Sequence, residues 1–179
     1  MTVDDNTLLK MLASPETKRK AFGLIVSQYS EMLYWKIRHF VLYHDDADDV
    51  MQNVLMKAWM NIDRFKADSK ISTWLYSIAV NESLDFLRRK KNVADADADL
   101  YAARHLIADE YFAGAATEAL LQEAIARLPD MQRTVFLLRY YDEMKYSEMS
   151  KMLERTEGAL KANYHIAAQK VLDYIKHRD

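Results

Sequence analysis

Apolar residues recur along the first third of the chain at intervals of about three to four positions, the spacing of one face of an α-helix. One such stripe follows Ser14 and Pro15 and consists of Phe22, Ile25, Tyr29, Leu33 and Ile37. A second stripe consists of Val50, Val54, Ala58 and Ile62. Serine before proline is typical of a helix N-terminus with proline in the first turn. Each stripe therefore predicts a helix that buries one face in a core.

A third helix is predicted to begin at Ser72 or Thr73, either of which can serve as its N-cap. Its candidates for burial are Leu75, Ile78, Ala79 and Phe86, and its candidates for exposure are Asn81, Asp85, Arg88 and Arg89. The segment ends in the cations Arg88, Arg89, Lys90 and Lys91. These cations either complement the negative end of the helix dipole or contact DNA, and the pattern favours neither alternative.

The second half of the chain predicts further helices joined by short connections. An apolar block from Leu120 is followed by a new helix at Pro129 and Asp130, in which Val135, Phe136, Leu138 and Tyr141 continue the pattern. Residues 146–153 form a short predicted helix, Glu154 and Arg155 connect it to the next, and Thr156 caps a final helix toward Lys176. Two helices joined by so short a turn predict a helix-turn-helix.

Composition supports an all-α fold of two small helical domains. The 179 residues include only 3 glycines and 2 prolines, so the turn residues of a sheet protein are scarce. Residues 93–120 contain 1 Lys or Arg against 6 Asp or Glu, whereas residues 1–92 contain 14 against 12 and residues 121–179 contain 10 against 9. We therefore predict domains at 1–92 and 121–179, joined by an acidic linker at 93–120. Near-neutral domains are expected to bind DNA weakly and with strong salt dependence when alone.

Composition also argues against several classes of function. The absence of cysteine excludes disulfides and thiolate metal sites, and the five histidines lack the spacing of zinc ligands. Paired acids such as Asp45 and Asp49 have no nucleophile or glycine-rich phosphate loop near them, so we expect no enzyme, no cofactor and no metal. The chain has no apolar run of about 18 residues and no secretion signal, so we expect a cytoplasmic protein without membrane insertion.

Acidic residues gather before the second apolar stripe, where Asp45 to Asp49 are expected to supply the cap and the first-turn carboxylates of its helix. Spacing alone favours such ordinary capping for Asp46, Asp48 and Asp49. A calcium loop is a poor alternative because the required glycine and terminal glutamate are missing.

The segment from Asp46 to Arg89 resembles the conserved second region of the extracytoplasmic-function (ECF) sigma factors, which direct core RNA polymerase to bacterial promoters. The resemblance rests on an ordered series that includes Asp49, Gln52, Trp59, Phe65, Asp68, Ser69, Thr73, Trp74, Tyr76, Asn81, Asp85, Arg88 and Arg89. A second block resembles the fourth region of the same family through Leu128, Pro129, Arg133, Phe136, Tyr146, Glu148, Leu153, Thr156, Gly158 and Lys161.

The resemblance implies three binding surfaces. Core polymerase is expected to bind at Asp46, Asp48, Asp49, Gln52 and Asn53. A loop that captures a flipped base, with the helix after it, is expected to bind the minus-ten element through Arg64, Lys66, Asp68, Ser69, Lys70, Trp74, Tyr76, Asn81, Asp85, Arg88 and Arg89. The helix-turn-helix is expected to read the minus-thirty-five element through Thr156, Glu157, Lys161, Asn163, Tyr164 and His165. Aromatic residues at helical spacing are more often core, and we expect Trp74 to be mostly buried.

The sequence departs from the family pattern at a few positions, including Asn53, Leu55 and Ala67 in the first block and Asn163, Ile166 and Ala168 in the second. Family members are usually sequestered by an anti-sigma protein, so the resemblance implies core RNA polymerase, promoter DNA and an anti-sigma factor as partners. Two hypotheses compete with a sigma factor. A stand-alone DNA-binding regulator would use only its helix-turn-helix, and a structural helical adaptor would make no DNA contact.

Overall fold

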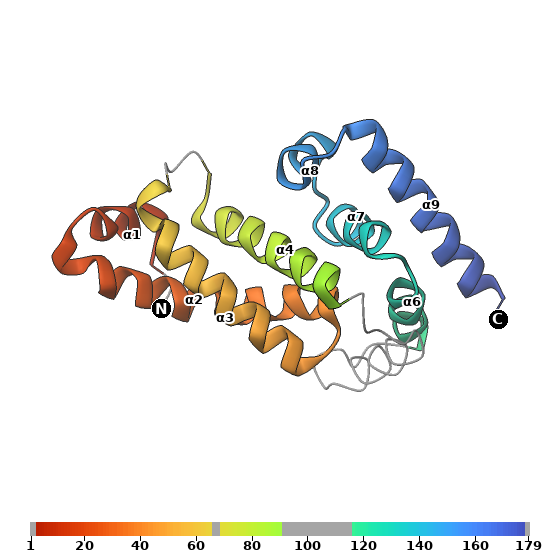
Figure 1. Ribbon diagram of the computed structural model, residues 1–179, viewed down its shortest axis with the longest axis horizontal. Helices are drawn as coiled ribbons and strands as arrows, with labels where there is room; N and C mark the ends of the chain where they lie inside the picture. The colour runs from red at the N-terminus through yellow and green to blue at the C-terminus, as the bar shows by residue number, and fades with distance from the viewer. Residues whose placement is uncertain (1–2, 66–68, 91–115, 178–179) are drawn as a thin grey trace. The chain divides into compact units, whose positions relative to one another are not determined.

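The computed structural model describes residues 3–65, 69–90 and 116–177, and the secondary structure within these ranges is helical (Figure 1). The chain divides into two compact units, Met1–Phe86 and Leu87–Asp179. The all-α class and the two-domain organisation predicted from the sequence are therefore confirmed. Residues 93–115 of the predicted acidic linker lie outside the described residues. Residues 116–120, which were also assigned to the linker, belong to a helix, Ala116–Ala126.

The first unit begins with helix α1, Asp5–Leu12, which the sequence analysis did not predict. Its N-cap is Asp4, whose Oδ1 accepts a hydrogen bond from the Thr7 N–H at 3.0 Å. The Thr7 hydroxyl donates to Asp4 Oδ2 at 2.6 Å. These bonds from Thr7 hold the pKa of Asp4 below its usual value of 3.8, because they favour the ionised carboxylate.

Helix α2, Pro15–Val41, starts as predicted, with Ser14 as N-cap and proline in the first turn. Its apolar face buries Ile25, Leu33 and Ile37. The helix ends at Val41, and its C-cap residue Leu42 has a positive φ of 67°. The buried Arg38 guanidinium donates to the Leu42 carbonyl and so holds this corner, which sets the start of the next helix.

Helix α3, His44–Asn61, packs against α2 and continues into the 3₁₀-helix η1, Ile62–Arg64 (Figure 1). The predicted stripe is confirmed, since Val50, Val54, Ala58 and Ile62 are all buried. The predicted aspartate cap is wrong because Tyr43 occupies the N-cap position without a side-chain bond. Asp45 and Asp46 lie in the first turn, where their negative charges interact favourably with the positive end of the helix dipole.

Helix α4, Ile71–Lys90, buries Leu75 and Ala79 on the predicted face. It starts one to two residues earlier than predicted, so neither Ser72 nor Thr73 is its cap. The N–H of Ile71 donates instead to Oδ2 of Asp5 at 3.1 Å, across 66 positions of sequence. A helix that appeared to be capped locally is therefore capped by a distant element.

The second unit contains α6, Ala116–Ala126, α7, Asp130–Tyr140, α8, Tyr146–Leu153, and α9, Glu157–Lys176. Its core includes Ile125, Leu138, Met149 and Leu160. The buried Arg133 donates from Nη2 to the carbonyls of Ala126 at 3.0 Å and Leu128 at 3.3 Å, which fixes the corner between α6 and α7.

The predicted helix-turn-helix is confirmed in its bounds. Glu154 has a left-handed conformation with φ 52°, which ends α8. The Thr156 hydroxyl then accepts from the Ala159 N–H at 3.3 Å and caps α9. Within residues 3–65, 69–90 and 116–177, no helix combines the length and apolar character needed to cross a bilayer.

Candidate functional site

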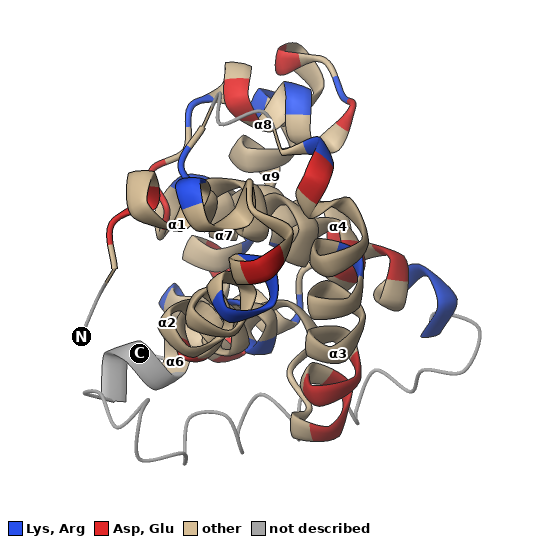
Figure 2. Cartoon of the chain, turned by 90° about the vertical axis from the view of Figure 1, so that its left-hand side faces the viewer, with Lys and Arg blue, Asp and Glu red and all other residues tan. Residues whose placement is uncertain are grey.

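The first candidate surface is the exposed side of α3, whose first turns gather the acidic residues (Figure 2). Asp48, Asp49 and Gln52 are exposed, while Asp46 and Asn53 are partly exposed. The structure thus places the predicted polymerase-binding residues on one helix, with Ala47 and Val50 buried beneath them.

Two polar contacts connect the acidic side of α3 to α2. His44 Nε2 lies 3.4 Å from Oδ2 of Asp48, and His44 Nδ1 is hydrogen-bonded to the Tyr34 hydroxyl of α2. The sequence analysis did not predict these contacts. The four-residue interval between His44 and Asp48 was a usable signal, but the contact with Tyr34 depends on how α2 packs.

The exposed side of α3 becomes apolar after Gln52. Met56, Trp59 and Met60 are all exposed, and Met60 is 71% exposed. Because Gln52, Met56 and Met60 follow one another at four-residue intervals, they lie along one side of the helix. The acidic surface therefore continues into an apolar one, which the sequence analysis did not predict.

The second candidate site is an open pocket of about 360 Å³ in the first unit. Side chains from α3, η1 and α4 line it, namely Lys57, Asn61, Arg64, Trp74, Ile78, Asn81 and Glu82. Arg64, Trp74 and Asn81 were predicted to bind DNA, and the structure brings them together. Lys57, Asn61, Ile78 and Glu82 were missed because their membership depends on the packing of α4 against α3.

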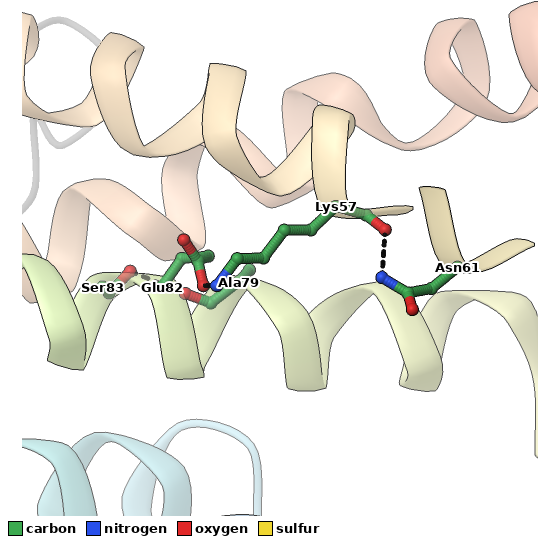
Figure 3. A network of polar contacts seen from close by, with 5 residues as sticks. All are labelled: Lys57, Asn61, Ala79, Glu82 and Ser83. Carbon is green, nitrogen blue, oxygen red and sulfur yellow. Dashed lines mark hydrogen bonds and ion pairs between the residues drawn. The ribbon is translucent and has the colours of Figure 1, made fainter. Parts of the chain in front are cut away.

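An ion pair forms one part of the pocket (Figure 3). Lys57 Nζ contacts Oε1 of Glu82, whose side chain is only 7% exposed, whereas that of Lys57 is 50% exposed. Asn61 Nδ2 donates to the Lys57 carbonyl at 2.8 Å, which leaves the amide oxygen of Asn61 as an acceptor. Because the lysine offsets the carboxylate, the pocket offers both donors and acceptors without an uncompensated negative charge.

Trp74 supplies an aromatic side of the pocket. The side chain is partly buried and packs on Phe65 with ring centroids 5.0 Å apart. The Ser77 hydroxyl donates to the Trp74 carbonyl at 2.7 Å, within the same helix. An aromatic side chain that packs on a neighbouring ring, as Trp74 does on Phe65, can stack on a planar ligand such as a base.

The other predicted minus-ten residues have mixed positions. Ser69 and Lys70 are exposed just before α4, and Arg88 and Arg89 are exposed near its end, while Asp85 is partly exposed. Lys66 and Asp68 lie outside the described residues. Tyr76 is only 7% exposed, with Lys36 Nζ 4.3 Å from its ring centroid, and this burial argues against the predicted contact of Tyr76 with DNA.

The third candidate surface is the outer side of α9. Lys161 and His165 are exposed, and Lys161 Nζ lies 3.6 Å from Oε2 of Glu157. The amide of Asn163 donates to the Ala159 carbonyl at 2.8 Å, so one of its donors is occupied within the helix. Ile166, one of the positions that depart from the family pattern, is also exposed on this helix.

The inner side of α9 holds Tyr164, which was predicted to contact DNA. Its ring packs on Phe136 at 5.8 Å and on Tyr146 at 6.5 Å, so it mainly joins α9 to α7 and α8. Tyr146 in turn has two cations near its ring, Arg139 at 5.4 Å and Lys161 at 5.6 Å. Arg139 and Tyr146 were not predicted as site residues, and only the fold brings them beside Lys161.

Comparison with known proteins gives two family matches. Residues 25–93 match the family described as Sigma-70 region 2, and residues 118–171 match Sigma-70, region 4. The ECF RNA polymerase sigma factor SigW of Bacillus subtilis is 33% identical over 156 residues, covering 81% of this chain and 83% of that protein. The ECF RNA polymerase sigma-E factor of Escherichia coli K12 is 28% identical over 171 residues, covering 86% and 85%.

Two solved structures have the same fold as this chain. The sigma factor RpoE, in complex with the anti-sigma factor NepR from Bartonella quintana, has a TM-score of 0.65 and 21% identity and covers 88% of this chain and 98% of that one. CnrH, in complex with the cytosolic domain of CnrY, has a TM-score of 0.66 and 23% identity and covers 98% and 99%. These two likenesses concern the fold.

Proposed function

This chain belongs to the extracytoplasmic-function sigma factors of the sigma-70 family, and from that premise we propose which of its surfaces carry each step of promoter recognition. As a sigma factor it directs core RNA polymerase to promoters and takes part in transcription initiation. The first domain, at 1–92, binds core polymerase and the minus-ten element, and the second, at 121–179, binds the minus-thirty-five element. Residues 93–120 link them.

The pocket of the first domain takes one unstacked base of the minus-ten element. Its volume of about 360 Å³ accommodates a base, and Trp74 offers a stacking surface. Lys57, Asn61 and Glu82 offer donors and acceptors to the base edge. Such a combination of an aromatic side, polar groups and nearby cations is how proteins recognise unpaired bases. This convergence of α3, η1 and α4 on one pocket is the observation that carries the proposal.

The acidic side of α3 binds core polymerase. Asp48, Asp49 and Gln52 are exposed there on a rigid helix, so a basic partner surface can approach all three at once. Because the helix already holds these side chains in place, less conformational entropy is lost on binding. In a binding assay with purified core enzyme, Asp49→Arg and Gln52→Ala should weaken the complex and reduce promoter-dependent RNA.

The outer side of α9 enters the major groove of the minus-thirty-five duplex. Lys161 and His165 lie in the N-terminal half of the helix, which is the part that reaches base edges in helix-turn-helix proteins. The nearby Arg139 adds a cation at the end of α7. The positive charges of Lys161 and Arg139 attract the phosphate backbone on either side of the groove.

Catalysis belongs to core polymerase in this proposal, and no residue of this chain takes part in bond formation. The protein acts in the cytoplasm, where core polymerase meets promoter DNA. An anti-sigma protein is its proposed regulator. The support is that RpoE, a sigma factor of the same fold, has been solved in complex with the anti-sigma factor NepR.

An abasic scan of the non-template strand tests the pocket directly. Holoenzyme is bound to promoter DNA that is already open at the minus-ten element and lacks one base at a time. We expect one position at which base removal costs about 1–3 kcal/mol, the size of one stacked base. Trp74→Leu should abolish that sensitivity, while Trp74→Phe should keep most of it. A wild-type holoenzyme that responds to no base removal would refute the proposal.

A further inference from the structure

Two residues that precede the region-2 match hold the parts of the chain that form the pocket. The match begins at residue 25, whereas Asp5 belongs to α1 and Lys18 to the first turns of α2. The pocket itself is lined by Arg64 of η1 and Trp74 of α4. One bond from each N-terminal residue reaches one of these two elements.

Asp5 caps the start of α4. Its Oδ2 accepts from the Ile71 N–H at 3.1 Å, and Trp74 follows Ile71 by three residues, within the same helical turn. The first N–H groups of a helix have no partner within it, and a carboxylate there also favours the positive end of the helix dipole. The bond therefore fixes the end of α4 from which Trp74 projects.

Asp5 is itself held in place. The Tyr29 hydroxyl of α2 donates to its Oδ1 at 3.2 Å, so each carboxylate oxygen has a partner. Burial of Tyr29 and the nearby negative charge of Asp5 raise the pKa of this tyrosine above its usual 10.0. Just before α1, the Val3 N–H donates to Oε1 of Gln28 at 2.9 Å. These contacts join α1 to α2 and make Asp5 a fixed acceptor.

Lys18 holds η1. Its Nζ lies 2.6 Å from both carboxylate oxygens of Asp63, and its side chain is only 24% exposed. The same Nζ lies 5.3 Å from the ring centroid of Trp59, which packs edge-on against Phe22 at 5.0 Å. The ammonium group is thus located by an aromatic side chain as well as by the ion pair. Asp63 immediately precedes Arg64, so this contact anchors that side of the pocket.

We propose that Asp5 and Lys18 are positioning residues for minus-ten recognition, which hold α4 and η1 at the separation that a flipped base requires between Trp74 and Arg64. This inference rests on the proposed function of the pocket. A binding site whose supporting contacts are loosened by about 1 Å loses much of its affinity, since stacking and hydrogen bonding to a base both depend on position. Neither residue touches DNA in this scheme.

The abasic scan of open promoter DNA also tests these two residues. Lys18→Met keeps the aliphatic part of the side chain and removes the ion pair, and Asp5→Ala removes the cap of α4. At the sensitive minus-ten position, Lys18→Met should reduce the ratio of affinities for intact and abasic DNA by about two- to five-fold, the range for a partly exposed ion pair. Asp5→Ala should reduce this ratio by a similar factor, because it removes a helix cap. Lys20→Met and Asn6→Ala, at exposed positions of α2 and α1, serve as matched controls and should leave the ratio unchanged.

A charge exchange separates positioning from general destabilisation. The double variant Lys18→Asp with Asp63→Lys restores the ion pair with the two charges exchanged. It should recover most of the decrease in the ratio of affinities for intact and abasic DNA. The affinity for core polymerase should be the same in all of these variants. The inference is overturned if Lys18→Met and Asp5→Ala keep the full ratio while Trp74→Leu abolishes it. It is also overturned if core binding falls in the same proportion as the ratio. If the wild-type ratio is one at every position, the proposed function fails and this inference fails with it.

Discussion

Removal of the Lys57 ammonium group should destabilise the first unit by isolating a buried carboxylate. The Glu82 side chain is 7% exposed and Lys57 is its ion-pair partner, itself 50% exposed. Breaking a fully buried pair costs about 3–5 kcal/mol, whereas exposed pairs contribute only about 0.2–1 kcal/mol. Because one partner is buried and the other half-exposed, we expect Lys57→Met to lower the free energy of unfolding by about 1–3 kcal/mol.

Tryptophan fluorescence during urea unfolding measures this effect in the full chain. The protein has 3 tryptophans, Trp35, Trp59 and Trp74, and all belong to the first unit, so the signal reports that unit alone. The urea midpoint should fall while the slope of free energy against urea stays the same. Lys70→Met, which removes an exposed lysine, serves as the control and should change stability by less than about 0.5 kcal/mol.

A double-mutant cycle with Glu82→Gln shows whether the charge is the cause. Glutamine keeps the size of the side chain and removes the charge, so Lys57→Met should cost much less in that background. A loss from Lys57→Met that is equal in both backgrounds, or below about 0.5 kcal/mol, would refute the reasoning that the lysine compensates a buried charge.

Further outcomes follow from the caps, the cations and the titrating groups. Thr156→Ala should lower the stability of the second unit by about 1 kcal/mol in thermal unfolding followed by circular dichroism, because it removes the α9 cap. Lys161→Met should weaken binding of the holoenzyme to the minus-thirty-five duplex and reduce the slope of affinity against salt by about one. The contribution of Tyr29 to stability should be complete below its usual pKa of 10.0 and fall as pH rises through its raised value, as a spectroscopic titration compared with Tyr29→Phe would show. In Asp5→Asn that pKa should move down, since a negative charge that opposes ionisation is gone.

The sequence by itself determined the features that depend on neighbouring residues. The buried stripe from Val50 to Ile62 and the start of α2 after Ser14 are both as predicted. The bounds of α8 and the capping of α9 by Thr156 are also as predicted. Helical periodicity and capping act over a few positions, so they can be recognised in the order of residues alone. The family resemblance added the grouping of these helices into two sigma-factor domains.

Only the tertiary structure decided which distant side chains meet. It buries Tyr76 and turns Tyr164 toward Phe136, although both were predicted to face DNA. It also replaces the expected local cap of α4 by Asp5 and places Glu82 beside Lys57. These outcomes depend on how whole helices pack, since the side of a helix that faces another is set by the complete core. Sequence spacing defines a helix face, and packing decides what that face contacts.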